Sequence, residues 1–387
     1  MFKYLLLIIL VFTPYLLSGY FFTGYSYIII GLYSFLQGVN ISRSVLISYL
    51  VLLTVASLQS LIHGLEYMGF VKLIFFLPFI YFTASFVINR YYPHDTGIGL
   101  VKDLVILTFI NSLLSYGALL SRGFADTFYK IVYVNPKLFD YPIFRPSGLF
   151  FDGYSYASSF NTIVVIVAIT FIVERAKTLV LLFFGTMLFI ILANNLFLGR
   201  FGIVIFLLYI PIYIFRKYRS FLTNFISSKT ILMLIVFTLV VRLILNTQVS
   251  NYVEWALSFI ELFSSKQSNS TASELLSNHY NIHLDGYEWL FGNPMLRDGL
   301  SIDPGIFRII NFGGLILLMA FTVFFLTCFR SVYKVHREYR HILITILVFF
   351  IVANFKDVYI VSPYAITFIY CLLYINFKNS SCAVDVS

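Results

Sequence analysis

The side chains best suited to chemistry gather between Leu290 and Gly314, in the segment LFGNPMLRDGLSIDPGIFRIINFGG. Its charged residues fall close together in the chain: Arg297, Asp298, Asp303 and Arg308. Glycine and proline interrupt the segment repeatedly, which indicates turns rather than one continuous helix. Charges carried on such backbone beside apolar sequence are costly unless water, a ligand or one another satisfies them. The segment is therefore a candidate functional site.

Three more arginines occupy comparable positions. Arg145 lies among Gly and Pro in FRPSGLFFDGYSYASSF, Arg200 follows ANNLFLG, and Arg242 lies one turn from the end of an apolar run. A guanidinium group makes bidentate, permanently charged contacts with phosphate oxygens. Several arginines facing one cavity at a membrane surface would suit a lipid-linked pyrophosphate. For any single arginine the alternative is a side chain that reaches the lipid headgroups.

Sequence signatures of metal sites and of common soluble enzymes are missing. We find no H-E-x-x-H, C-x-x-C, P-loop, G-x-S-x-G or Asp-x-Asp pattern, so neither a metal nor a cofactor is expected. His279 and His283 lie in a hydrophilic segment, and we interpret them as solvated. A pair formed by His283 and Asp285 is the alternative.

The composition predicts the kind of protein that must position these groups. Of 387 residues, 60% are apolar, 19% aromatic and only 11% charged, and the mean hydropathy is +0.91. Soluble domains are about a quarter charged, so the chain is expected to be a polytopic membrane protein. The formal charge of +9 fits lysine and arginine in cytoplasmic loops rather than binding of nucleic acid. The three cysteines lie outside the long polar segments, so no disulfide is expected.

A bilayer span needs about 20 apolar residues. The sequence therefore predicts an all-α fold in a single transmembrane domain, 1–387, with a retained first helix. Because the first and last pairs are short, ten or eleven spans are alternatives to twelve. The twelve predicted helices lie near 3–18, 22–38, 44–63, 68–89, 101–121, 155–173, 178–195, 196–215, 229–246, 306–328, 341–356 and 361–377.

The distribution of basic residues predicts the orientation. With twelve spans, the most basic loops fall on one side, which the positive-inside rule makes cytoplasmic together with both termini. The two long polar loops, 122–154 and 247–305, then face the periplasm or cell exterior. Most acidic residues, eleven of seventeen, fall on that outer side, and the middle of the helices holds almost no ionisable group. Ion-coupled transporters generally need such groups near the bilayer midplane.

Three segments carry a family pattern. The run Arg145–Ala157, RPSGLFFDGYSYA, combines Arg, Gly, Phe and small residues at the entry to a helix; Leu198–Arg200 starts another. Leu290–Gly314 leads into a helix after the large outer loop. Together with the twelve-span plan and two outer loops, these segments resemble the bacterial O-antigen polymerases, within the wider O-antigen ligase and polymerase group. The resemblance covers most of the chain.

The resemblance implies a metal-independent glycosyl transfer at the outer face of the bacterial inner membrane. The growing glycan leaves its undecaprenyl pyrophosphate carrier and joins the non-reducing end of a new lipid-linked repeat unit. Expected partners are these lipid-linked oligosaccharides, membrane lipid and a protein that regulates chain length; no nucleic acid is expected. Ligases of the group typically have His where this chain has Asp303, which favours a polymerase. A ligase acting on lipid A-core and a lipid-oligosaccharide flippase are the alternatives.

The resemblance also implies roles for individual residues. Arginines would neutralise the leaving pyrophosphate without a metal, and a partly desolvated carboxylate would accept the proton of the attacking hydroxyl. Asp303 is the first candidate for this base, followed by Asp152 and Glu288; positioning Arg308 is its alternative role. The expected catalytic residues are Asp303, Arg145, Arg200 and Arg308. The expected substrate-binding residues are Arg242, Arg297, Asp152, Tyr154 and Glu288.

Overall fold

Helices make up most of the residues that the computed structural model describes, together with one two-stranded ladder and several turns. Among the described residues, three helices are long and apolar enough to cross a membrane: α3 (Arg43–His63), α6 (Ile98–Leu120) and α15 (Gly305–Val332). The described residues are 2–12, 15–16, 22–39, 41–64, 68–93, 95, 97–133, 146, 148–150, 154–170, 178–199, 202–203, 205–207, 209–211, 213, 284–293, 305–335, 337–354 and 364–384.

The chain forms two compact units, and both are assembled from separated parts of the sequence. Unit 1 comprises Met1–Thr23 and Gly97–Lys266, and unit 2 comprises Gly24–Thr96 and Gln267–Ser387. Each unit therefore has its own packed helices and its own interior.

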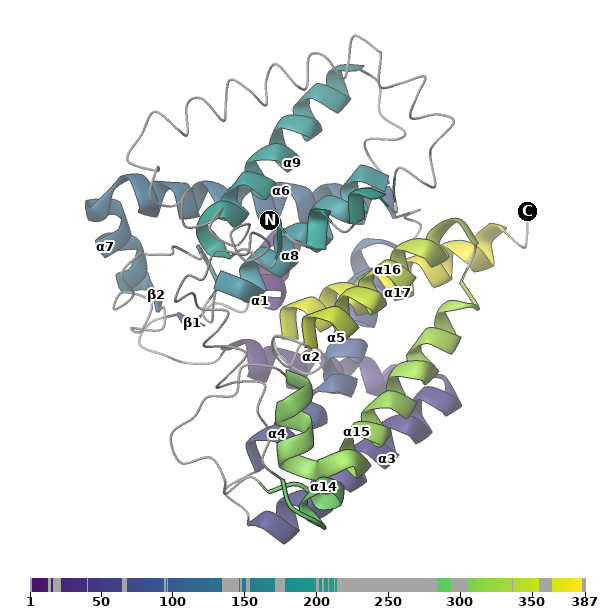
Figure 1. The fold of residues 1–387 in the computed structure, drawn as a ribbon. Coiled ribbons are helices and arrows are strands. Elements are labelled where there is room, and N and C mark those ends of the chain that lie inside the picture. The colour runs from purple at the N-terminus through teal and green to yellow at the C-terminus, as the bar shows by residue number, and fades with distance from the viewer. Residues whose placement is uncertain are drawn as a thin grey trace. The chain divides into compact units, whose positions relative to one another are not determined.

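Unit 1 is built around a central helix. It contains α1 (Phe2–Phe12), α6, α7 (Arg122–Ile131), α8 (Tyr154–Ala168) and α9 (Thr178–Leu198). Helices α6, α8 and α9 contact one another (Figure 1). All residues of α8 from Ala157 to Ala168 are buried. A helix that buries every face belongs in the interior of a bundle, and here that helix also carries polar side chains.

Helix α1 is fixed to the rest of unit 1 at both ends. Near its start, the Lys3 ammonium group lies 2.6 Å from the Asp103 carboxylate of α6, which also accepts a hydrogen bond from the Tyr4 hydroxyl at 3.1 Å. The pairing offsets the cost of burying Asp103. Beyond its end, β1 (Tyr15–Leu16) pairs antiparallel with β2 (Val132–Tyr133).

Unit 2 pairs early helices with late ones. Its helices are most of α2 (Phe22–Leu36), then α3, α4 (Met68–Phe75), α5 (Leu77–Tyr91), α14 (Glu288–Phe291), α15, α16 (Arg337–Asn354) and α17 (Tyr364–Val384). Helix α3 lies along α15, and α5 packs against α17 (Figure 1). The interior of unit 2 therefore forms between segments that are far apart in the sequence.

The predicted boundaries are confirmed best for long uninterrupted apolar runs. Helices α3 and α6 match the predicted 44–63 and 101–121 within three residues at each end. The prediction of a helix over 3–18 is wrong at its end, because α1 stops at Phe12 and the chain then enters β1. The predicted helix 68–89 is divided at Phe76, since Pro78 in the first turn of α5 lacks an N–H donor.

Three further predictions concern a helix boundary, the first outer loop and a helix near 229–246. The boundary predicted at 195/196 is wrong, because α9 continues to Leu198. Helix α7 occupies part of the segment predicted as the first outer loop. The helix predicted over 229–246 lies outside the described residues.

Candidate functional site

A set of buried polar side chains lies where α6, α8 and α9 meet in unit 1. All have at most 1% of their surface exposed. Neutral polar groups in such a setting are costly unless they are hydrogen-bonded. We call this set the polar cluster; it comprises Asn111, Ser112 and Ser115 of α6, Ser158, Asn161 and Thr162 of α8, and Asn194 and Asn195 of α9.

Hydrogen bonds join the polar cluster across all three helices. Asn194 Nδ2 donates to Ser112 Oγ at 3.4 Å, which connects α9 with α6. Asn195 Nδ2 donates to Thr162 Oγ1 at 3.0 Å, and Asn161 Nδ2 donates to Asn195 Oδ1 at 3.1 Å, which connects α9 with α8. Since these bonds form only in one alignment of the helices, they fix the register of the bundle.

The polar cluster also holds the backbone on both sides of Arg200. Ser158 Oγ donates to the Gly199 carbonyl at 2.6 Å and accepts from Gly202 N at 3.1 Å. Thr162 Oγ1 donates to the Gly202 carbonyl at 2.9 Å. A Cβ atom at Gly202 would collide with Ser158, so the close approach requires glycine here. The residues flanking Arg200 are therefore attached to α8.

The segment that follows Arg145 is attached to the same cluster. Asn111 Oδ1 accepts a hydrogen bond from Leu149 N at 2.7 Å. Gly148 adopts a φ of 64°, and a side chain there would also meet Asn111. From α7, Tyr129 contacts the same turn: burial raises its pKa, and a hydrogen bond with the Gly148 backbone acts in the opposite direction. The turn after Arg145 is thus held between α6 and α7.

Because Asn111 and Ser112 are neighbours, the attachments beside Arg145 and Arg200 belong to one continuous set of contacts. Some buried polar atoms of this set make no hydrogen bond within the described residues. Asn111 Nδ2, Ser115 Oγ, Asn161 Oδ1 and Asn194 Oδ1 have no hydrogen-bond partner in the described part of the chain. Buried polar atoms of this kind are uncommon and require an explanation such as an unseen water or ligand.

A second arrangement lies in unit 2, where the two ends of the segment Leu290–Gly314 contact each other. Asn293 N donates to the Asn311 carbonyl of α15 at 2.8 Å. Gly292 has a φ of 81°, and a Cβ there would lie 2.6 Å from the Asn311 carbonyl oxygen. Gly314 interrupts α15 with a φ of 64°, and a Cβ there would meet the Leu290 backbone. The α14 turn therefore sits directly on the break in α15 (Figure 1).

Side chains reinforce the α14 turn. Glu288 Oε2 accepts from Asp285 N at 3.0 Å, and Glu288 Oε1 accepts from Asn293 Nδ2 at 2.5 Å. At the end of α3, His63 Nε2 lies 2.9 Å from the Phe291 carbonyl oxygen. The Glu288 carboxylate thus stabilises the fold of its own turn.

The predicted site residues are described to different degrees. Arg308 is partly buried in the first turn of α15, Glu288 belongs to the α14 turn, and Tyr154 begins α8. Leu149, four residues after Arg145, and Gly199, which precedes Arg200, each bond to the polar cluster. The other predicted site residues lie outside the described residues: Arg145, Asp152, Arg200, Arg242, Arg297 and Asp303.

Sequence reasoning missed the polar cluster, although signals for it were present. Asn194 and Asn195 are adjacent amides in a strongly apolar helix, and Ser158 and Thr162 are four residues apart on one helix face. Polar residues inside a membrane segment are expensive and mark functional positions. Attention to charge alone passed over these neutral groups.

Comparison with known proteins gives no family for this chain: neither the protein-family models nor the curated proteins contain a match. In the described part of the chain, no group of three or more His, Cys, Asp or Glu residues is placed to hold a metal ion. The site must therefore be interpreted from its own geometry.

Proposed function

We propose that the chain is a multi-pass membrane glycosyltransferase that polymerises a surface polysaccharide. It transfers the growing glycan from undecaprenyl pyrophosphate to a new lipid-linked repeat unit at the periplasmic face of a bacterial inner membrane. One observation carries the proposal: the backbone beside Arg145 and the backbone beside Arg200 are both fixed to the polar cluster. Two arginines whose sequence neighbours bond to one buried cluster suit a pyrophosphate leaving group.

The proposed topology has about twelve spans, with both termini in the cytoplasm and loops 122–154 and 247–305 in the periplasm. The positions of the basic residues in the sequence support this arrangement. The polar cluster then lies toward the periplasmic ends of α6 and α9.

The proposed chemistry divides between the arginines and a carboxylate. An acceptor hydroxyl attacks the anomeric carbon of the donor glycan, the bond to pyrophosphate breaks, and a base takes the hydroxyl proton. Arg145 and Arg200, both of unit 1, stabilise the charge that grows on the leaving pyrophosphate. Asp303 is the base, and Arg308 a further cation, that the family resemblance implies. The neutral amides of the polar cluster position the flanking backbone, so that little reorganisation accompanies the reaction.

The distribution of buried charge favours an enzyme over an ion-coupled transporter. Within the described residues, Asp103 is the only charged side chain that is buried, and Lys3 pairs with it. Transporters and proton pumps place ionisable groups near the bilayer midplane, where their protonation or ion binding drives the cycle. The described helices carry buried Asn, Ser and Thr instead.

The decisive experiment is the lipid-linked glycan profile of a cell that lacks this protein. Single repeat units transferred to lipid A-core are expected, with long chains restored by the wild-type gene. Loss of all transfer to lipid A-core would indicate a ligase. Accumulation of lipid-linked repeat units on the cytoplasmic face would indicate a flippase. Either of the last two results overturns the proposal.

A further inference from the structure

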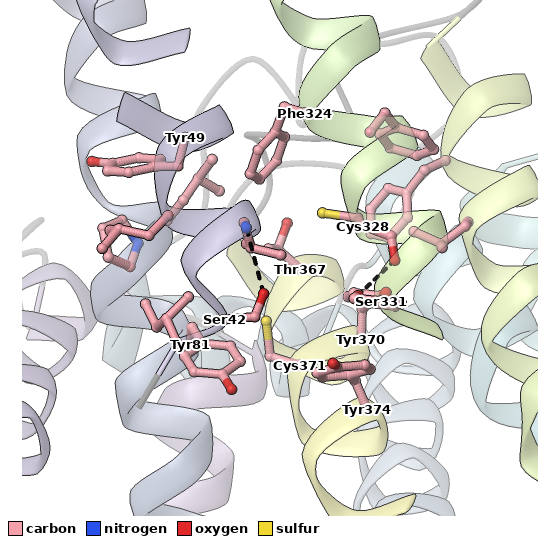
Figure 2. A pocket seen from close by; sticks show the side chains of 18 of the residues that line it. Ser42, Tyr49, Tyr81, Phe324, Cys328, Ser331, Thr367, Tyr370, Cys371 and Tyr374 are labelled. Atoms are coloured by element: carbon pink, nitrogen blue, oxygen red, sulfur yellow. Dashed lines mark hydrogen bonds between the residues drawn. The ribbon is translucent and has the colours of Figure 1, made fainter. Parts of the chain in front are cut away.

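A cavity of about 120 Å³ lies inside unit 2, far in sequence from the polar cluster. Five helices contribute to its wall: α3, α5, α15, α16 and α17 (Figure 2). Its wall therefore includes both of the long-range helix pairs of unit 2, α3 with α15 and α5 with α17.

The cavity is elongated along α17. Thr367 and Lys378 both line it, and both belong to this helix. Eleven residues of α-helix separate them, which corresponds to roughly 16 Å at 1.5 Å per residue. On α15, Phe324 and Ser331 also line it two turns apart. A narrow space that follows helices for several turns has the shape of an aliphatic chain rather than of a compact metabolite.

The lining is apolar, and its serines are satisfied within the protein. Aromatic and aliphatic side chains predominate, and the sulfur atoms of Cys328 and Cys371 point into the space between the helices (Figure 2). Ser42 Oγ accepts from Val45 N at 3.4 Å, and Ser331 Oγ donates to the Cys328 carbonyl at 2.7 Å. Apolar cavities stay dry or take apolar guests, so the lining selects hydrocarbon.

Positive charge marks one end of the cavity. Lys378 belongs to the lining itself. Two further lining residues have exposed arginines beside them in the sequence. Arg43 follows Ser42, and Arg330 precedes Ser331. Basic residues at the membrane surface attract anionic lipid headgroups. The combination is a hydrocarbon slot that ends at cationic side chains.

We infer that this cavity binds one acyl chain of an anionic phospholipid, with its phosphate against Lys378. The volume is close to that of the engineered cavity of about 150 Å³ that takes benzene. It therefore holds a segment of a single aliphatic chain and is too small for a folded polyprenyl tail. The inference requires only that unit 2 lies in a membrane; it is independent of glycosyl transfer.

Such a lipid would act as a structural element of unit 2. A chain in the cavity contacts α3, α5, α15, α16 and α17 together, so it adds packing between the two long-range helix pairs. Each buried methylene strengthens binding about fourfold. A lipid that binds the folded state alone also stabilises that state, so unfolding of the full chain should depend on the lipid supplied.

Native mass spectrometry of the full chain in mild detergent tests the inference, with phosphatidylglycerol and phosphatidylcholine of matched acyl chains as probes. Lys378→Gln should weaken phosphatidylglycerol binding about fivefold and leave phosphatidylcholine unchanged. Cys371→Phe, which fills the cavity, should weaken both lipids about a hundredfold. The matched controls Lys334→Gln and Met319→Phe change exposed residues outside the lining and should bind like the wild type.

Three results would overturn the inference: no lipid retained by the wild type, wild-type binding by Cys371→Phe, or an unchanged headgroup preference in Lys378→Gln. Displacement of phosphatidylglycerol by stoichiometric undecaprenyl phosphate would assign the cavity to a prenyl chain and would also overturn it. If Cys371→Phe fails to fold, a phosphatidylglycerol with a photoreactive acyl chain replaces it. Crosslinks to the α15 and α17 peptides are expected, and crosslinks confined to other helices contradict the inference.

Discussion

Asn111 and Leu149 are joined by a hydrogen bond of 2.7 Å, from the Leu149 N–H to the Asn111 side-chain oxygen. This one contact fixes the turn after Arg145 to α6, where the next residue, Ser112, bonds to α9. A turn that begins three residues after Arg145 is thus bonded to a neutral amide buried in a helix. The first prediction below tests this contact, and the others test a glycine and charged residues of the proposed site.

Replacing Asn111 by Ala should reduce polymer formation and lower the thermal stability. The Leu149 N–H then loses its acceptor, and a buried unsatisfied donor costs about 1–3 kcal/mol. Glycan ladders and thermal unfolding measure the two effects. Thr108→Val on the same helix is the matched control, since Thr108 is buried and its hydroxyl donates to the Leu104 carbonyl of its own helix. Equal effects of the two substitutions would contradict a special role for Asn111.

Gly202→Ala should damage the region around Arg200. The added Cβ would collide with Ser158 and would displace the backbone from α8, and overpacking of this kind costs about 1–3 kcal/mol. We expect shorter glycan chains at normal protein levels in the membrane. Gly123→Ala is the control, because nothing lies within 4 Å of the added atom there. Wild-type ladders from Gly202→Ala would show that the contact with Ser158 does not position Arg200.

Arg145→Lys and Arg200→Lys keep the charge but lose the planar guanidinium that binds two phosphate oxygens at once. Each should lower the polymerisation rate about a hundredfold, in the range found when one donor to a developing anion is removed. Rates of chain extension in membranes carrying equal amounts of protein provide the measurement. Arg122→Lys, at the exposed start of α7, serves as the control. Near-normal rates in both variants would reduce the two arginines to headgroup anchors.

Asp303→Asn preserves size and hydrogen bonding but cannot accept a proton. If Asp303 is the base, this variant should still bind lipid-linked substrate while making almost no polymer, and Asp303→Glu should retain part of the activity. Binding and extension are measured separately on the same membranes. Asp285→Asn, exposed in the α14 turn, is the control. Long chains from Asp303→Asn would move the search for the base to Asp152 and Glu288.

Reporter fusions test the proposed topology. A periplasm-active reporter fused after residue 270 should be active, and one fused after residue 219 should be silent, because the basic run before it belongs to the cytoplasm. A cytoplasmic reporter should give the reverse pattern. A cytoplasmic location for residue 270 would defeat the topology and, with it, the periplasmic site.

The sequence predicted the elements whose free energy is dominated by local transfer into lipid. The apolar runs of α3 and α6 each have one favourable state in a bilayer, so their bounds could be read directly. The end of α1 could not, because Tyr15 pairs with Tyr133 across more than a hundred residues. A hydropathy pattern contains no information about such a partner.

The same distinction applies to the site. Arg308 stands out by its charge, and its predicted place at the start of a helix is confirmed. The roles of Asn111 and Asn194 depend on their hydrogen-bond partners, Leu149 and Ser112, which lie far away in the sequence. A single buried amide has no periodic sequence pattern that would reveal such a partner. Gly314 lies inside the helix predicted over 306–328, and its positive φ and close approach to Leu290 emerge only when α14 packs on α15.

The hydrogen bond between His63 and Phe291 has a consequence for biogenesis, since its partners lie 228 positions apart. A ribosome adding about 5–20 residues per second needs roughly 10 to 45 s to produce the second partner after the first. Throughout that interval α3 has no α15 to pack against. The pairing of these two helices therefore forms late in synthesis, long after α3 itself has been made.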